Sequence, residues 1–490
     1  MSVSSTNPVP PYVDWPTAAT NIQDAVDVST NGDTVLVTNG VYATGGKNWF
    51  GSGTNRVTLT NAITLQSVNG PGVTWIVGNR IAGTGTALTN AVRCVAIGSS
   101  AVLSGFSLTN GEAGTGNYPN GGGVSQVQSV SAAGTVTNCV LIGNLSTNGV
   151  GGGAYRVKLF NCQIIWNYAT SGGGACACTL LNCTVASNTA SSGGGIYGGS
   201  VYGVSIAKNC ILKNNFATST GGGGYGGNMT NCLVFGNSAT TEGGGVWTGN
   251  SDLVYNCTIF SNTASASGGV REGVCVNSII TFNNAGTYPN GHPLSVLNCC
   301  IAPLQAGTGN ITNEPAFVNP AAGDFHLSSN SPCINSGNNT YATSSTDLDG
   351  NPRIAGGTVD IGAYEYPSPV SRISYAWLQY YGIPITTNTD TSDADGDGMS
   401  NYAEWVAGTN PTNPASLLQM QFPSNNLSGL TVSWQSVSNR TYYLQRATDL
   451  GAAPAFSGLK SNIAGQAGTT SYADTTATNR VPYFYRVGVQ

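Results

Sequence analysis

The sequence predicts an all-β protein in which a right-handed parallel β-helix is followed by a small β-sandwich. Three observations lead to this prediction. An Asn-Cys unit recurs through the middle of the chain, glycine makes up 68 of the 490 residues, and only 8% of the residues are charged. Glycine is thus about twice as frequent, and charge about a third as frequent, as in an average globular protein. A helical protein with an ion-laced surface is therefore excluded.

The repeat unit begins with an Asn-Cys pair that recurs every 21–27 residues. A second asparagine follows six residues after the first, from Asn144 to Asn283, and a glycine run closes the unit. This period suits one coil of a parallel β-helix, made of three short strands joined by turns. The pairs begin at Asn138, Asn161, Asn182, Asn209, Asn231, Asn256 and Asn298, with Asn277-Ser278 in the remaining place.

Within each unit the residues alternate with period two. Cys139 and Leu141, and their counterparts Cys162 and Ile164, occupy alternate positions and should point inward. Stacked coils would then bury a continuous core that no single strand could bury alone. We expect the seven cysteines that follow asparagine to form a ladder of buried thiols acting as small hydrophobes. Disulfides between coils and metal binding by these cysteines stay open as alternatives.

The asparagines and glycines have a physical role at the corners of the coils. Asparagine tolerates a left-handed backbone, and its amide can bond its own backbone and the asparagine of the next coil. We therefore expect ladders of stacked asparagines, and glycine runs at the other corner where the backbone has positive φ or a close neighbour.

Residues 100–300 carry the unit N-C-x-(I/V/L)-x-x-N-x-A-x-x-(S/T/E)-G-G-G-(A/I/V)-(Y/W). This unit resembles the repeats of secreted bacterial, pectate-lyase-like parallel β-helix proteins and those of polymorphic outer-membrane adhesin passengers. The resemblance implies an extracellular or cell-surface protein. It does not imply one activity, since the architecture hosts lyases, hydrolases and adhesins. The first residues lack a basic region followed by an apolar stretch, so we expect a signal peptide to have been removed before Met1.

We expect residues 1–60 to cap the β-helix and residues 61–366 to form it. In the cap, Asn21 precedes a short amphipathic helix, and residues 33–37 and 63–65 are the first strands. Residues 314–366 resemble the ending of many secreted bacterial β-helix proteins, and we interpret them as the last coils and the closure. Their charged side chains should pin irregular turns, with a calcium or catalytic site as the alternative: Asp324, His326, Asp347, Asp349, Arg353, Asp360 and Glu365.

Residues 367–415 form a linker that contains an aromatic, helix-like stretch at 375–381 and a calcium motif. The motif matches the twelve-position loop D-x-D-x-D-G-x5-E, and its hard oxygen ligands at this spacing select Ca²⁺. It resembles dockerin-like and thrombospondin-type-3-like calcium loops, and its expected role is to stiffen the domain junction. The expected ligands are the carboxylates of Asp393, Asp395, Asp397 and Glu404, the carbonyl of Met399, and Asn401.

Residues 416–490 alternate as in a β-sandwich, with strands around Val432, Leu444 and Tyr485. The segment resembles the fibronectin-type-III-like C-terminal modules of secreted bacterial proteins. Such a module either binds a glycan or serves as a spacer.

Composition limits the function. With 16 Lys and Arg residues and a net charge of −5, nucleic acid is excluded as a partner, and no apolar run reaches the ~18 residues of a membrane helix. Only two histidines are present, so a catalytic site has few options. The catalytic residues stay unknown, and the weak candidates are Glu242, Arg271 and Glu272, which should lie on adjacent coils.

One outward position after each glycine run is often aromatic. The aromatics at this position are Tyr155, Tyr197, Tyr225 and Trp247, and they should align along one face. They could stack on the sugar rings of an extended polymer or simply stabilise the strands. The leading hypothesis is an extracellular, adhesin-like or glycan-binding, non-catalytic protein with a calcium-stabilised C-terminal module. The alternative is a lyase or glycoside hydrolase acting on an acidic or neutral polysaccharide, and self-association or surface attachment stays open.

Overall fold

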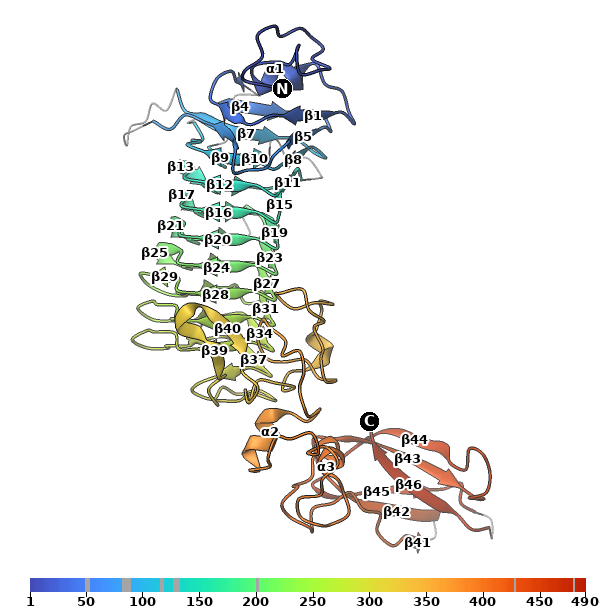
Figure 1. The fold of residues 1–490 in the computed structure, drawn as a ribbon. Helices are drawn as coiled ribbons and strands as arrows, with labels where there is room; N and C mark the ends of the chain where they lie inside the picture. Colours follow the sequence, from blue (N-terminus) through green and yellow to red (C-terminus); the bar gives the residue numbers. More distant parts are fainter. Residues whose placement is uncertain are drawn as a thin grey trace. The chain divides into compact units, whose positions relative to one another are not determined.

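The computed structural model describes residues 1–48, 53–81, 90–114, 119–126, 133–199, 202–426, 429–478 and 481–490. The chain forms two compact units (Figure 1). The first contains residues 1–333, 337–355 and 359–367, and the second contains residues 334–336, 356–358 and 368–490.

The first unit is a parallel β-helix built on three eleven-stranded sheets, which we name A, B and C. All strand pairs in these sheets are parallel except β3–β4. Sheet A consists of β1 (Thr34–Val37), β5 (Thr64–Ser67), β8 (Val102–Ser104), β11 (Thr135–Thr137), β15 (Lys158–Phe160), β19 (Thr179–Leu181), β23 (Ile206–Lys208), β27 (Asn228–Thr230), β31 (Leu253–Tyr255), β34 (Val274–Val276) and β37 (Ser295–Leu297).

Sheet B follows sheet A in each coil, and sheet C completes the coil. Sheet B consists of β2 (Gly40–Tyr42), β6 (Thr74–Val77), β9 (Ser107–Thr109), β12 (Val140–Ile142), β16 (Gln163–Ile165), β20 (Thr184–Ala186), β24 (Ile211–Lys213), β28 (Leu233–Phe235), β32 (Thr258–Phe260), β35 (Ile279–Thr281) and β38 (Cys300–Ile301). Sheet C consists of β3 (Lys47–Asn48), β4 (Thr54–Leu59), β7 (Val92–Ile97), β10 (Val124–Gln126), β14 (Ala154–Tyr155), β18 (Ala175–Cys176), β22 (Ile196–Tyr197), β26 (Gly224–Tyr225), β30 (Val246–Trp247), β33 (Val270–Arg271) and β36 (Gly291–His292).

Equivalent residues of successive coils are in register. Leu141 pairs with Ile164, Ile164 with Val185, and Val185 with Leu212, and all four side chains are fully buried. The predicted fold class, an all-β chain with a parallel β-helix followed by a small β-sandwich, is confirmed.

The thirteen cysteines are all buried and unpaired, so the buried-thiol interpretation is confirmed and no disulfide links the coils. Burial raises the pKa of Cys139, Cys178 and Cys299 to about 12. These thiols are therefore protonated core side chains rather than reactive thiolates.

The two asparagines of each unit have different roles. The first stands at a corner with a left-handed backbone, with φ between 49° and 54° from Asn138 to Asn298. The second is buried and bonds to the next coil: the backbone N and Nδ2 of Asn167 donate to Oδ1 of Asn188 at 2.9 and 3.0 Å. The ladder continues unbroken from Asn144 to Asn290, so the expectation of stacked asparagines is confirmed.

Five coils contain a fourth strand, whereas the sequence predicts three strands per coil. A small residue such as Ala169 or Ala190 turns inward beside the asparagine ladder, and the chain continues extended until the glycine run. These strands form sheet D: β13 (Leu145–Val150), β17 (Tyr168–Ser171), β21 (Thr189–Ser192), β25 (Phe216–Thr220) and β29 (Ser238–Ala239).

The amino-terminal end is closed by α1 (Ile22–Asp27). The side chain of Asn21 accepts from the backbone N–H of Asp24 and so caps this helix. The segment expected to be the cap also contains β1, β2 and β4, which are already the first strands of the three sheets.

Residues 314–366 form no further coils, contrary to the expectation that they contain the last coils of the β-helix. The last coil ends at β38, and the chain then folds back through β39 (Phe317–Asn319), η1 (Pro320–Ala322), β40 (Asp324–Leu327) and η2 (Asn339–Tyr341). Phe325 and Tyr364 pack on Leu233, Phe235 and Phe260 of the outer face of sheet B. Figure 1 shows β39 and β40 lying against the side of the coils. The chain folds back here because the outer positions of these coils are apolar, and packing the closing segment on them removes that apolar surface from water.

The second unit contains two helices and two three-stranded antiparallel sheets. Val432, Trp434, Tyr442 and Leu444 form its core. No helix among the described residues is long and apolar enough to cross a membrane. Its elements are α2 (Tyr375–Tyr380), α3 (Asn401–Ala407), β41 (Ser424–Asn426), β42 (Gly429–Ser436), β43 (Thr441–Ala447), β44 (Ser457–Ala464), β45 (Gly468–Asp474) and β46 (Phe484–Val489), with sheet orders β41-β42-β45 and β44-β43-β46.

Candidate functional site

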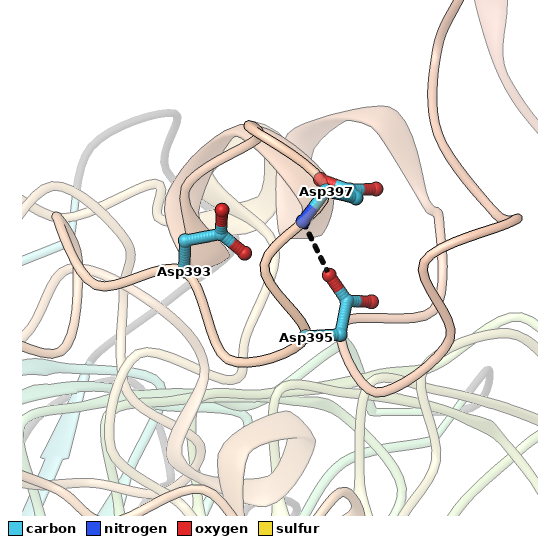
Figure 2. Close-up of side chains that lie close together, drawn as sticks. All are labelled: Asp393, Asp395 and Asp397. Atoms are coloured by element: carbon cyan, nitrogen blue, oxygen red, sulfur yellow. Dashed lines mark hydrogen bonds between the residues drawn. The ribbon is translucent and has the colours of Figure 1, made fainter.

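The acidic loop before α3 brings three carboxylates together. Asp393, Asp395 and Asp397 offer oxygens that all lie within 4.8 Å of one another (Figure 2). The carboxylate of Asp393 accepts from the backbone N–H of Gly396 at 2.8 Å and of Gly398 at 2.9 Å. Both glycines have positive φ, at 79° and 96°, which the tight turn of the loop requires.

Several oxygens of this loop lack a partner among the residues that the structure describes. They are Oδ2 of Asp395, Oδ2 of Asp397, Oδ1 of Asn401 and Oε2 of Glu404, and all are buried. A buried oxygen without a donor is costly unless a ligand satisfies it. Because all the atoms that could bind a metal here are hard oxygens, this set fits Ca²⁺.

Glu404 reaches the loop from α3 and is fully buried. Burial, and then the nearby charges of Asp395 and Asp397, raise its pKa to about 7. Glu404 lies outside the group of mutually close oxygens, which comprises only the three aspartates. Of the other expected ligands, Asn401 starts α3 and donates its Nδ2 to the carbonyl of Thr389 at 2.9 Å, and the sulfur of Met399 accepts from the N–H of Leu418.

The predicted aromatic row lies on sheet C. Each residue pairs with the next across successive coils. The ring centroids of Tyr197 and Tyr225 are 4.8 Å apart with an interplanar angle of 5°, and those of Tyr225 and Trp247 are 4.4 Å apart at 7°. In coil order the row is Tyr155, Cys176, Tyr197, Tyr225, Trp247, Arg271 and His292.

This stacking changes what the row presents to solvent. Both faces of Tyr225 are covered by its neighbours, so its edge and hydroxyl point outward. Tyr155 is buried, which corrects its expected place on a sugar-binding surface. The reason is a loop from a later coil: Tyr155 packs with Cys176 and Tyr202, and Arg156 donates to the carbonyl of Tyr202. The row stabilises the strands along most of its length.

Charged side chains gather at the open end of the row. Nε of Arg271 lies 3.1 Å from Oε2 of Glu242, and its Nη1 lies 3.3 Å from Oε1 of Glu272. The structure thus brings the three weak catalytic candidates together beside Trp247. His292 pairs with Arg271 on the next coil and so lies beside this group, although it is not among the site residues predicted from the sequence. The signal was available, because His292 follows Arg271 by 21 residues, one repeat length.

The charges of the closing segment separate into two groups. His326 is bonded through Nδ1 to Asp324 and through Nε2 to Asp349, both at 2.6 Å, and lies on the ring of Tyr364. Arg353 is buried and donates to the carbonyls of Asp360 and Gly362. Nη1 of Arg353 lies 3.8 Å from Oε2 of Glu365. The backbone N–H of Glu365 in turn donates to Oδ2 of Asp347. Both groups join turns of the closing segment, as the pinning interpretation expects.

Comparison with known proteins gives limited similarity. No family model and no curated protein matches the sequence. The crystal structure of pectate lyase Pel9A is similar over 74% of this chain and 95% of that chain, with 14% identity and a TM-score of 0.44. The A-module of the Azotobacter vinelandii mannuronan C-5 epimerase AlgE4 is similar over 58% of this chain and 92% of that chain, with 12% identity and a TM-score of 0.28. Similarity at this level transfers no activity to this chain.

Proposed function

We propose that this chain is an extracellular or cell-surface, adhesin-like β-helix that binds a glycan without cleaving it, and that calcium stabilises its C-terminal module. The observation that carries the glycan proposal is the juxtaposition at the open end of the aromatic row. Trp247 lies beside Arg271, which Glu242 and Glu272 hold in place. An indole ring beside fixed donors and acceptors offers both stacking and hydrogen bonds to a sugar.

The shape of this surface favours an extended polymer. Successive residues of the row repeat at the coil spacing of about 4.8 Å. Hydroxyl edges of Tyr197 and Tyr225 continue the surface away from Trp247. A chain of sugars lying along the coils would meet one side chain of the row at each step.

The test is affinity electrophoresis of the whole protein in gels that contain a polysaccharide, neutral or acidic. We expect Trp247→Ala to weaken retardation by about tenfold or more, the loss of one well-packed aromatic contact. Tyr380→Ala is the matched control, because Tyr380 is 81% exposed on α2 in the other unit. An unchanged affinity of Trp247→Ala contradicts the proposed surface.

The calcium proposal rests on the unpartnered oxygens around Asp395, Asp397 and Glu404. When bound, the ion supplies positive charge to this loop. The helix α3, which follows the loop, adjoins the sandwich, since Arg440 donates to the carbonyls of Trp405 and Val406. An ordered loop would therefore hold α3 against Arg440, the residue before β43. We propose that the sandwich is a fibronectin-type-III-like module and that the ion stiffens its junction with α3.

Calcium binding is tested by titration calorimetry and by thermal unfolding with Ca²⁺ and with EDTA. At a free Ca²⁺ concentration of 100 times Kd, binding stabilises the unit by about 2.7 kcal/mol. Asp397→Asn should reduce this gain, whereas Asp449→Asn, an exposed acid of the sandwich, should not. If EDTA leaves the unfolding of the second unit unchanged, the loop does not hold calcium.

Cleavage of a polysaccharide is the second candidate function, and one observation favours it. Glu242, Arg271 and Glu272 converge beside an aromatic side chain, as an acid–base site on sugars requires. The test follows new reducing or unsaturated ends on a panel of neutral and acidic polysaccharides. Turnover that is lost in both Glu242→Gln and Glu272→Gln would replace the binding proposal by an enzyme.

A further inference from the structure

A second set of aromatic side chains lies on the outer face of sheet D and at the corner before it. Trp166 is 64% exposed, Tyr168 46% and Phe216 40%. None of these rings contacts another aromatic ring among the residues that the structure describes. These exposed rings are therefore not stacked on one another, unlike Tyr225, whose two faces are covered by neighbouring rings of the stacked row.

The rings are placed by the register of the coils. Tyr168 pairs with Thr189, and Thr189 pairs with Phe216, so one coil separates the two rings. The two side chains thus project from the same outward position about 9.6 Å apart, twice the strand spacing of about 4.8 Å. Trp166 precedes Tyr168 by two residues, at a left-handed corner with φ of 55°.

A column of hydroxyl groups runs beside the rings. In the five coils from β17 onward, the outward position two residues further along is exposed and always carries a hydroxyl. The hydroxyls of Ser191, Thr218 and Thr240 donate to no group in the described parts of the chain, so they are available to a ligand. The column consists of Thr170, Ser191, Thr218, Thr240 and Ser265, and the column beside it consists of Tyr168, Thr189, Phe216, Ser238 and Thr263.

We propose that the outer face of β17, β21 and β25 binds a neutral, extended polysaccharide, with sugar rings on Tyr168 and Phe216. Open aromatic faces accept the C–H face of a sugar, and unpartnered hydroxyls accept and donate to its hydroxyl groups. Neither column contains a charged residue. An acidic polymer would need cations that these columns do not offer, and a charged protein partner would find no ion pair.

This inference extends the proposed glycan binding to a second face, and the two faces can fail separately. The experiment uses the whole protein in affinity gels with hydroxyethyl cellulose, galactomannan or arabinoxylan, and with polygalacturonate as the acidic polymer. The test variant is Tyr168→Ala with Phe216→Ala. The comparison variant is Trp247→Ala, which reports on the sheet C face alone. Light scattering measures self-association of every variant.

We expect at least one neutral polymer to retard the wild type and the double variant to bind it about tenfold or more weakly, since each stacking contact contributes a factor of about 2 to 12. Trp247→Ala should still be retarded by that polymer, because the sheet D face stays intact in that variant. Unchanged affinity of the double variant, retardation by polygalacturonate alone, or no retardation by any neutral polymer overturns the proposal. A dimer that the double variant abolishes also overturns it, because the face would then be a contact between copies.

Discussion

The buried asparagine ladder makes a sharp prediction at Asn188. Its Oδ1 accepts from the backbone N and Nδ2 of Asn167 at 2.9 and 3.0 Å. Its Nδ2 donates to the carbonyl of Ile164 at 2.8 Å and to Oδ1 of Asn215 at 3.0 Å. The side chain is fully buried, so no solvent stands ready to replace these bonds.

Replacing Asn188 by alanine leaves two buried donors without an acceptor. The N–H of Asn167 and one of its amide hydrogens lose their partner, while Oδ1 of Asn215 keeps the bond from the backbone N of residue 188. Each unsatisfied buried group costs about 1–3 kcal/mol. Asn188→Ala should therefore lower the free energy of unfolding by at least about 2 kcal/mol.

The assay is urea unfolding followed by far-ultraviolet circular dichroism, with the slope of the transition checked for constancy. The control is Asn182→Gly, because Asn182 is an exposed corner residue with φ of 54° that glycine adopts freely. Its effect should stay below about 1 kcal/mol. A loss below about 1 kcal/mol for Asn188→Ala would mean that water replaces the amide, and the ladder would then not hold the coils together.

Three further predictions follow from particular contacts. Gly173→Ala should destabilise the protein by about 3 kcal/mol or more, since the new Cβ would lie 2.4 Å from the carbonyl oxygen of Thr189, whereas Gly72→Ala, with no atom within 4 Å, should be close to neutral in the same unfolding assay. The thirteen buried thiols should resist a thiol reagent in the native protein and all react in denaturant, and rapid native labelling would refute their burial. Burial lowers the pKa of His326, but the hydrogen bonds that its ring donates to the carboxylates of Asp349 and Asp324 raise it more, so that the pKa lies above its usual 6.5. The stabilisation is then complete below about pH 6.5 and fades as the pH rises, so His326→Gln should lower Tm more at about pH 5.5 than at about pH 8.5.

The coil architecture could be predicted because its signal is repeated. Most units place Cys139, Leu141 and Asn144, or their counterparts, at the same spacing, so that one pattern is confirmed many times along the chain. Sheet D could not be predicted in this way. Residues such as Ala169, Thr170 and Ser171 are short and carry little strand preference, and they become a strand only because neighbouring coils offer backbone partners.

The path of the closing segment depends on contacts across many residues. Leu233, Phe235 and Phe260 are apolar at outward positions where earlier coils have polar residues such as Gln163 and Thr184. That difference indicates that these coils need a cover, but it does not identify Phe325 and Tyr364 as the residues that supply it.

The candidate sites show the same division. The calcium loop is local, so its aspartates could be identified from spacing alone. The register of the aromatic row could be predicted too, but the orientation of its rings could not. Tyr197, Tyr225 and Trp247 turn their faces to one another because each ring gains contact area with its neighbour, and this depends on side-chain packing.

The return of the closing segment along sheet B divides the β-helix into two zones with different tolerance to changes in length. Between Asn138 and Cys210 each coil contacts mainly its neighbours, apart from the loop that brings Tyr202 onto Arg156. Outside the span of that loop, a whole coil could be inserted or deleted with only the spacing of the ends affected. In the zone that begins at Asn231, the side chains of Asn231, Asn256 and Asn277 each donate to a different carbonyl of the returning chain. Removing a coil from this zone would shift every one of these contacts by one step. Differences in the length of such a β-helix should therefore accumulate in its amino-terminal half.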